Sequence, residues 1–90
     1  MSKDETIRDA VQSVETASAL HDEWVSRAKQ LLRAEMVRRG VNNAQLAEKL
    51  RAIGVNDNER NLANKIARGG FTAAFFLQCM SALGVHTLHL

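Results

Sequence analysis

Apolar residues recur at helical spacing in several consecutive stretches of the chain. They predict an N-terminal segment, either a helical arm or a disordered leader, through residues 3–20, and then helices near residues 23–39, 43–53, 57–68 and 73–83. Proline, which breaks helices, is absent from the 90 residues. The pattern therefore predicts an all-α fold, a small helical domain of four to five helices.

Glycine marks the expected end of each of the later helices. Gly-Val occurs three times, and an apolar residue lies five positions before each valine, giving the pairs Met36–Val41, Leu50–Val55 and Met80–Val85. This spacing is typical of the Schellman motif, in which the glycine takes a left-handed conformation and the next residue packs on the last helical turn. Gly70-Phe71, with Ile66 five positions before the phenylalanine, predicts a fourth helix end of the same kind.

Polar residues mark the expected helix starts. Asp22 is predicted to cap the helix that runs to Arg39, and Thr72 the last helix. Three further pairs have capping-box spacing: Ser2 with Glu5, Asn42 with Gln45, and Asn56 with Glu59.

Charge divides the chain into two parts. Residues 1–22 carry two basic and five acidic side chains, a net charge of −3, whereas residues 23–90 carry ten basic and five acidic ones, a net charge of +5. We expect an acidic N-terminal arm or helix over residues 1–22 and one folded domain over residues 23–90. The basic domain, with a sequence pI near 9.1, suits a polyanionic partner.

Composition bears on the cellular compartment in which we expect the protein. The single cysteine, Cys79, cannot form an internal disulfide and fits a reducing compartment. The first residues lack the apolar stretch of a secretory signal, and no run is apolar enough for a membrane span. We therefore expect a soluble, cytoplasmic protein with no membrane partner.

The last two predicted helices differ in kind. In the segment 57–68, Leu62, Ala63, Ile66 and Ala67 share one side, and the opposite side carries Asn61, Asn64, Lys65 and Arg68, flanked by Asn58 and Arg60. The segment 73–83 is apolar nearly all round, so it requires cover from the first helix and leader or from another subunit.

The C-terminal tail, residues 85–90, alternates weakly between apolar and polar positions, which indicates either a short strand or a loop. A single strand needs a pairing partner, and a second copy of the chain would supply one. We expect a homodimer whose interface contains Phe75, Phe76, Met80, Leu88 and Leu90.

The centre of the chain has the features of a helix-turn-helix. Ala47 is small enough to let the next helix cross closely, and Gly54 lets the chain turn. The helix after this turn is expected to pack on the preceding one through Leu62, Ala63 and Ile66, which leaves its polar side free. In such motifs the second helix enters the major groove of DNA.

The same stretch resembles the lambda-repressor-like (XRE-type) helix-turn-helix domains. Their leucine-rich helix, recognition-helix end and core helix correspond here to Leu46–Leu50, Ile66–Gly69 and Ala82–Val85. The block NKIARGGFTAAFFLQC (residues 64–79) is also similar to a small bacterial domain of unknown function, over roughly residues 24–90. The connection after the leucine-rich helix is longer here than in XRE domains, and Ala67 stands where they usually carry a glutamate.

The resemblance implies a homodimeric, sequence-specific regulator of transcription that binds double-stranded DNA. Asn61 and Asn64 are the residue type that pairs with adenine, and Arg60 or Arg68 suits guanine or phosphate. The expected DNA-binding residues are Asn58, Arg60, Asn61, Asn64, Lys65, Arg68, Asn43 and Gln45. For each asparagine, a helix cap or solvated surface position is the competing interpretation.

A different class of function fits the same residues. Residues 56–70 carry three basic and two acidic side chains, a net charge of only +1, so the fold would also suit a protein-interaction module such as an adaptor, an antitoxin-like partner or a phage-type inhibitor. Such a module could use the acidic arm as well. We expect no enzyme, no cofactor and no metal site, since Cys79, His86 and His89 lack the spacing of a zinc module.

Overall fold

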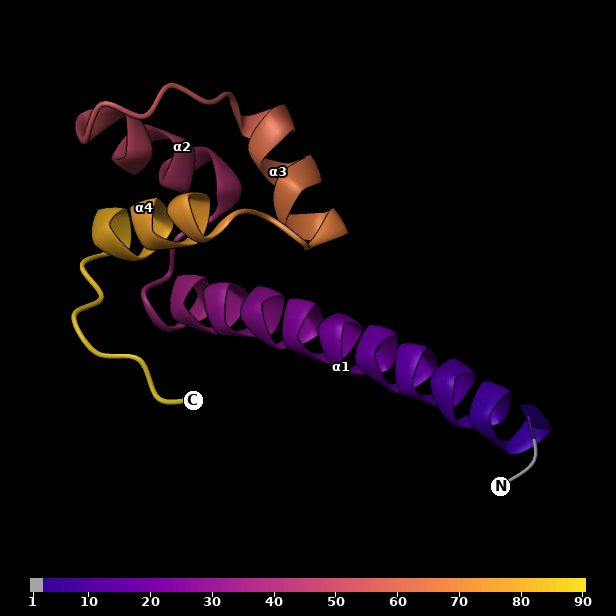
Figure 1. Ribbon diagram of the computed structural model, residues 1–90. Helices are drawn as coiled ribbons and strands as arrows, with labels where there is room; N and C mark the ends of the chain where they lie inside the picture. The colour runs from indigo at the N-terminus through magenta and orange to yellow at the C-terminus, as the bar shows by residue number, and fades with distance from the viewer. Residues whose placement is uncertain (1–2) are drawn as a thin grey trace.

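The computed structural model describes the main chain of residues 3–90, and side chains from residue 17 onward. It contains four helices: α1 (Lys3–Arg38), α2 (Asn43–Ala52), α3 (Glu59–Arg68) and α4 (Ala73–Leu83). The predicted all-α fold is confirmed. Figure 1 shows α4 between α1 and α2, with α3 at one end of this group.

The first helix is much longer than the sequence pattern predicted. α1 runs for 36 residues without a break, so Asp22 is an interior residue of a helix and not a cap. The prediction that a helix starts at residue 23 is therefore wrong; nothing in residues 17–24 interrupts the helix, and propensity carries it through. The predicted cap at Ser2 lies outside the described residues.

The N-terminal half of α1 extends beyond the three shorter helices (Figure 1). The molecule measures 60 × 26 × 19 Å, and its radius of gyration is 17.8 Å. A compact domain of this length has a radius of gyration of about 12 Å. The elongation follows directly from one helix leaving the packed body.

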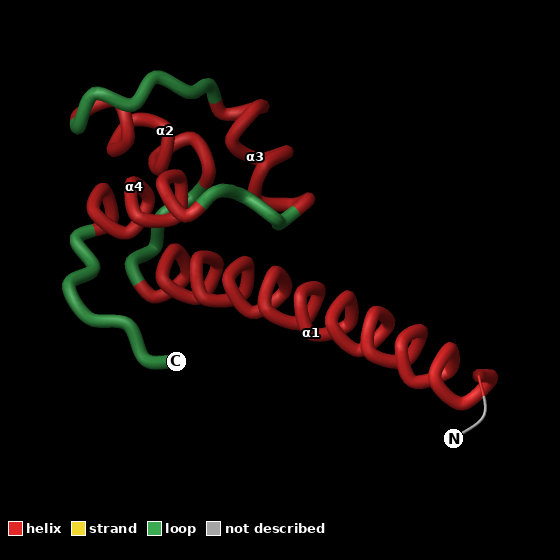
Figure 2. The backbone as a smooth tube through the Cα atoms, in the orientation of Figure 1, coloured by secondary structure: helices red, strands yellow, loops and turns green. Residues whose placement is uncertain are grey.

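Three helix ends have the predicted Schellman geometry. The amide of Val41 donates to the Met36 carbonyl oxygen, and the amides of Val55 and Val85 donate in the same way to Leu50 and Met80, each at 2.9 Å. The glycine before each valine has a positive φ. Spacing alone located these three turns; Figure 2 shows the first two as loops between helices and the third at the start of the C-terminal tail.

The end of α3 departs from that motif. The helix stops at Arg68, and the amide of Gly69 donates to the Lys65 carbonyl oxygen at 3.1 Å. Gly69 has φ 70° and ψ −167°, a conformation that essentially only glycine adopts. The predicted helix end at residue 68 is confirmed, but the predicted pairing of Ile66 with Phe71 is wrong, because Gly69 already ends the helix.

Gly69 also allows α3 to approach α1 closely. A Cβ atom there would lie 3.2 Å from Val25 Cγ1, and the Lys29 ammonium donates to the Ala67 carbonyl oxygen at 2.7 Å. The lysine satisfies a carbonyl group that the helix end leaves without a partner. The C-terminal end of α3 is therefore anchored to α1.

Polar caps begin the three shorter helices. Asn42 and Gln45 form the predicted capping box, and the Thr72 hydroxyl accepts from the Phe75 amide at 3.1 Å. At α3 the cap is Asn58, whose Oδ1 accepts from the Asn61 amide at 2.8 Å. The predicted cap at Asn56 is wrong, since the loop before α3 runs two residues further before the helix begins.

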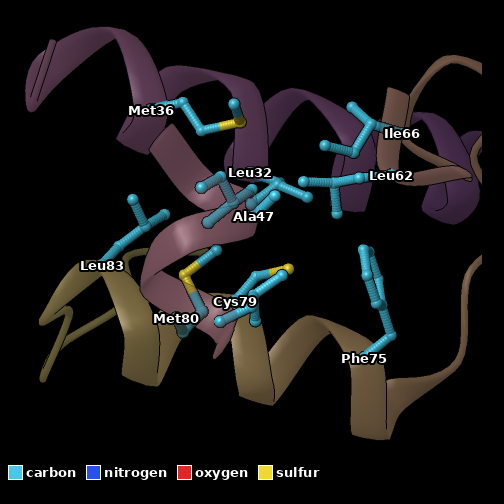
Figure 3. Close-up of a cluster of buried hydrophobic side chains, with 11 residues drawn as sticks. Leu32, Met36, Ala47, Leu62, Ile66, Phe75, Cys79, Met80 and Leu83 are labelled. Carbon is cyan, nitrogen blue, oxygen red and sulfur yellow. The ribbon is translucent and has the colours of Figure 1, made fainter. Parts of the chain in front are cut away.

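One hydrophobic core joins all four helices. Leu32 of α1, Leu46 and Leu50 of α2, and Leu62 of α3 are fully buried, together with Cys79 of α4. Ala47 is 3% exposed and lies between the larger side chains of neighbouring helices (Figure 3). The small side chain predicted to permit close helix packing is thus at the centre of the core.

A buried carboxylate fastens the end of α1 to the end of α4. Glu35 is 7% exposed and pairs with the guanidinium groups of Arg38, at 2.7 Å, and Arg39. Arg39 Nε also donates to the Leu83 carbonyl oxygen at 2.9 Å. A charged group can remain buried here because both of its oxygens have cationic partners.

The tail forms no strand in the described part of the chain. Residues 85–90 are irregular, with Val85 and Leu88 packed against the core. The interpretation of this tail as a strand is therefore wrong: Val85 and Leu88 turn toward the subunit's own core, and Leu90 is 77% exposed.

Candidate nucleic-acid interface on α3

Buried residues hold one side of α3 against the core. Leu62 is 0% and Ile66 3% exposed, and Ala63 on the same side is half-buried. These positions recur every three to four residues, so the helix has one clear inward side. The opposite side of the ten-residue helix consequently faces solvent.

That outward side carries two amides and two guanidinium groups. Arg60, Asn61, Asn64 and Arg68 are all exposed and fall within one side of the helix. These side chains are donors and acceptors of the kinds that read base edges in a major groove. The structure thus presents four of the eight predicted DNA-binding residues together on one surface.

Lys65 is held by its own subunit. Its ammonium lies 2.6 Å from Asp57 Oδ2 and 5.1 Å from the centre of the Phe75 ring. The ion pair neutralises the lysine, and the ring fixes its position at the edge of the core. Lys65 therefore ties the loop before α3 to α4, and a free phosphate contact would require it to leave Asp57.

Three other predicted residues lie at helix starts. Asn58 caps α3, and Gln45 uses its side-chain oxygen to accept from the Asn42 amide at 2.9 Å. Asn43 is the half-buried first residue of α2. The competing interpretation of Asn58 as a cap is confirmed, and its side-chain oxygen serves its own helix.

A basic residue that the sequence pattern did not single out joins this surface. Arg51, exposed in the last turn of α2, lines a hollow of about 290 Å³ with Asn56, Asp57, Asn58 and Asn61. The hollow lies between the end of α2 and the start of α3. The signal that could have found Arg51 in the sequence is its position in the last turn of the helix that precedes the predicted recognition helix.

The predicted dimer residues separate into two groups. Phe75 and Met80 are 7% and 4% exposed and belong to the subunit's own core (Figure 3), so they offer no surface to a second copy. Phe76 and Leu88 are half-buried, and Leu90 is 77% exposed. α1 and α2 of the same chain cover one side of α4, which is why Phe75 and Met80 are unavailable.

Cys79 is a core residue without access to solvent. Burial raises the pKa of its thiol to about 12 from an ordinary value of 9.0, and the nearby Lys65 lowers it less than burial raises it. Such a thiol behaves as a small apolar side chain. Across the residues that the structure describes, no three histidine, cysteine or acidic side chains gather as a metal site.

No single helix in the described part of the chain is long and apolar enough to span a membrane. α3 and α4 reach that length and apolarity only when taken together, and the two helices are bent by 118° relative to each other.

Comparison with known proteins gives a family and no activity. A family model described as a domain of unknown function, DUF6471, matches residues 24–88. No curated protein and no solved structure matches the chain. The matched range begins within α1 and includes the whole of α2, α3 and α4, so it covers the packed body of the molecule.

Proposed function

Because the chain belongs to the DUF6471 family, a family of domains of unknown function, its role has to be argued from its own surface, and we propose that it is a sequence-specific double-stranded DNA-binding protein. In this proposal α3 is the recognition helix, and the protein acts as a homodimeric transcriptional regulator of the lambda-repressor-like kind. The observation that carries the proposal is the outward side of α3, where Arg60, Asn61, Asn64 and Arg68 are exposed together.

The chemistry of that side supports base contacts. Each asparagine can pair with adenine through two hydrogen bonds, in which its side-chain oxygen accepts from adenine N6 and its side-chain nitrogen donates to adenine N7. Arg68 or Arg60 can donate two hydrogen bonds to guanine O6 and N7. The buried Leu62 and Ile66 fix the helix that presents these groups.

Phosphate contacts would come from the edges of the same surface. Arg51, at the end of α2, lies beside the start of α3 and adds a positive charge there. Backbone contacts of this kind set the register of the protein on the duplex without reading its sequence. Arg51 compensates in part for Lys65, whose charge is neutralised by Asp57.

The test begins with selection of bound sequences from random duplex DNA, followed by affinity measurement on the selected duplex. A palindromic motif with half-sites one helical turn apart is expected of a dimer that uses one recognition helix per subunit. Arg68→Ala and Asn61→Ala should each weaken binding by about 1–3 kcal/mol. Gln78→Ala, which removes an exposed amide of α4, is the matched control and should leave affinity within about twofold.

Salt dependence separates this proposal from the protein-interaction alternative. DNA binding should weaken steeply with salt, with a log–log slope of about −4 for four to five phosphate contacts per dimer. Selection that enriches no motif, or equal affinity of the wild type and both α3 variants, would contradict the proposal.

The protein-interaction module remains the second candidate, and one observation favours it. Lys65 is paired with Asp57, so the cations on the outward side of α3 are limited to Arg60 and Arg68, with Glu59 beside them. Mixed surfaces with arginine and amide groups are also suited to protein partners. A partner that binds α3 with weak salt dependence, in the absence of DNA binding, would establish this function instead.

A further inference from the structure

The middle of α1 carries two large apolar residues that the subunit leaves exposed. Trp24 is 55% and Leu20 50% exposed, and they lie one helical turn apart on the same side of α1. Arg27 lies 5.3 Å from the centre of the Trp24 ring but leaves more than half of this side chain in solvent. A large aromatic residue in this state is characteristic of an interface.

A shallow hollow adjoins the tryptophan. It has a volume of about 200 Å³ and is lined by His21, Trp24, Val25, Ala28, Gly70 and Phe71. The exposed side of α1 is therefore continuous with an apolar depression where α1 meets the loop between α3 and α4. A partner that lies along α1 would cover both features.

Charge along α1 identifies the partner. Residues 3–22 carry two basic and five acidic side chains, a net charge of −3, whereas residues 23–38 carry four basic and two acidic ones, a net charge of +2. Each half of this helix is thus complementary to the other half of an identical helix placed in the opposite direction. A parallel pair would instead put the two acidic halves together.

We propose that two copies of the chain associate through antiparallel α1 helices, with Leu20 of one subunit beside Trp24 of the partner subunit. The two-fold axis then passes near residue 22, so both Leu20–Trp24 contacts form at the centre of the interface. The same register aligns residues 4–9 with residues 35–40 of the partner subunit, which places an acidic segment along the turn that contains Arg38 and Arg39.

The pairing also explains how α1 persists beyond the body. An isolated helix of about 20 residues is marginal in water, and most helix stability in proteins comes from packing of one side. Two antiparallel α1 helices that pack around residue 22 supply that packing to each other. The interface lies on α1 and replaces the surface on α4 that the sequence pattern had indicated.

This inference deepens the proposed function by naming its dimer surface, but the pairing itself requires no DNA. The full chain in DNA-free buffer should sediment as a dimer at micromolar concentration. Trp24→Ala should raise the dimer dissociation constant at least about tenfold. Leu77→Ala, which truncates an apolar residue of α4 that is 63% exposed, is the matched control and should leave the constant unchanged.

A monomer at all concentrations up to about 100 μM, or a larger effect of Leu77→Ala than of Trp24→Ala, would overturn the proposal. Thermal unfolding of both variants by circular dichroism shows whether each is folded. If Trp24→Ala does not fold, Leu20→Ala provides the second test, because it truncates the exposed residue that lies beside Trp24 of the partner subunit and should also weaken the dimer. A Leu20→Ala protein that dimerises as tightly as the wild type would likewise overturn the proposal.

Orientation is tested with a spin label on Ala34→Cys, an exposed position of α1. Antiparallel pairing about residue 22 separates the two labelled positions by 24 residues along the axis, or about 36 Å, whereas a parallel pair brings them to within about 10–15 Å. The native Cys79 is buried, so the label reacts with the new residue. A short distance between labels would refute the antiparallel arrangement.

The outcomes for dimerisation and for DNA binding are distinguishable. A DNA-free dimer with the expected label distance that selects no duplex would uphold this inference and end the proposed function. A monomer that binds duplex DNA through α3 would do the reverse. In 1 M salt the dimer should dissociate more readily, by several-fold, because its charged ends are screened.

Discussion

α3 and α4 are consecutive helices of ten and eleven residues, but they divide their surfaces between core and solvent in different ways. α3 buries only Leu62 and Ile66 and leaves its amide and guanidinium groups outside. α4 buries Phe75, Cys79, Met80 and Leu83 and lies between α1 and α2 (Figure 1). The comparison indicates that α4 is the buried helix that supports α3, and we call α4 the platform. α3 presents the exposed amide and guanidinium groups.

The two helices are also connected by a side-chain contact and by a short turn of the chain. Lys65 of α3 lies over the ring of Phe75 in α4, and the chain between the helices turns at Gly69. The position of the outward side of α3 therefore depends on the packing of α4. Substitutions in the platform should reduce stability, and substitutions on the outward side of α3 should reduce binding while leaving the fold intact.

The largest effect is expected in the platform. Phe75→Ala should lower the free energy of unfolding by about 3–5 kcal/mol, because it removes a buried aromatic ring and leaves a cavity between α3 and α4. Leu77→Ala on the exposed side of the same helix should change it by less than about 0.5 kcal/mol. Urea unfolding measures both. Equal costs would contradict the assignment of a buried and an exposed side to α4.

The Cys79 thiol reports on burial of the platform chemically. Since the pKa of the thiol rises to about 12 in the folded protein, a thiol reagent at pH 8 should react about 10³-fold more slowly than with the unfolded chain. The unfolded thiol ionises near pH 9 and the folded one near pH 12. The free energy of unfolding should therefore be independent of this thiol below pH 9 and should fall as the pH rises from 9 to 12, because only the unfolded chain then loses the proton. Cys79→Ala should remove this pH dependence, which amounts to at most about 1.4 kcal/mol per pH unit. Fast labelling of the native protein would show that α4 is not packed as described.

A smaller effect is expected where the chain passes between the two helices. Gly69→Ala should destabilise the protein by about 2–3 kcal/mol, because alanine disfavours this backbone conformation and its Cβ would lie 3.2 Å from Val25 Cγ1. Gly40→Ala, at a positive φ with no atom within 4 Å of the added Cβ, should cost only about 1 kcal/mol. Thermal unfolding distinguishes the two. A milder cost at residue 69 than at residue 40 would argue against the close approach of α3 to α1.

The smallest effect is expected for the ion pair at the start of α3. Lys65→Met should change stability by about 1 kcal/mol or less, since the lysine side chain is 42% exposed although Asp57 is 10% exposed. DNA affinity should fall by less than it does for Arg68→Ala, because Lys65 is engaged by Asp57. Binding measurements on both variants make the comparison. A greater loss of DNA affinity from Lys65→Met than from Arg68→Ala would show that Lys65 leaves Asp57 and contacts a DNA phosphate.

Local signals in the sequence were sufficient for the ends of the helices. Three Gly-Val turns and the caps at Asn42 and Thr72 involve residues within five positions of one another, so short-range spacing determines them. The division of α3 into an apolar and a polar side was likewise visible, because helical periodicity places those residues. The all-α fold follows from these elements together.

Long-range features could not be predicted in the same way. Asp22 has the residue type of a cap, but only the continuous helix decides that it is interior. Phe75 and Met80 looked available for a second copy because nothing in the spacing tells that α1 and α2 cover α4. Similarly, the pairing of Lys65 with Asp57 joins two residues whose charges had been counted separately.

The most direct test of the central claim is the backbone amide NMR spectrum of the full chain during titration with its selected duplex. The account predicts that the largest shifts fall on α3, residues 59–68, and on Arg51 at the end of α2, with α4 affected little. Shifts concentrated on α1 or α4, or no shifts at any duplex concentration, would show that the outward side of α3 does not bind DNA.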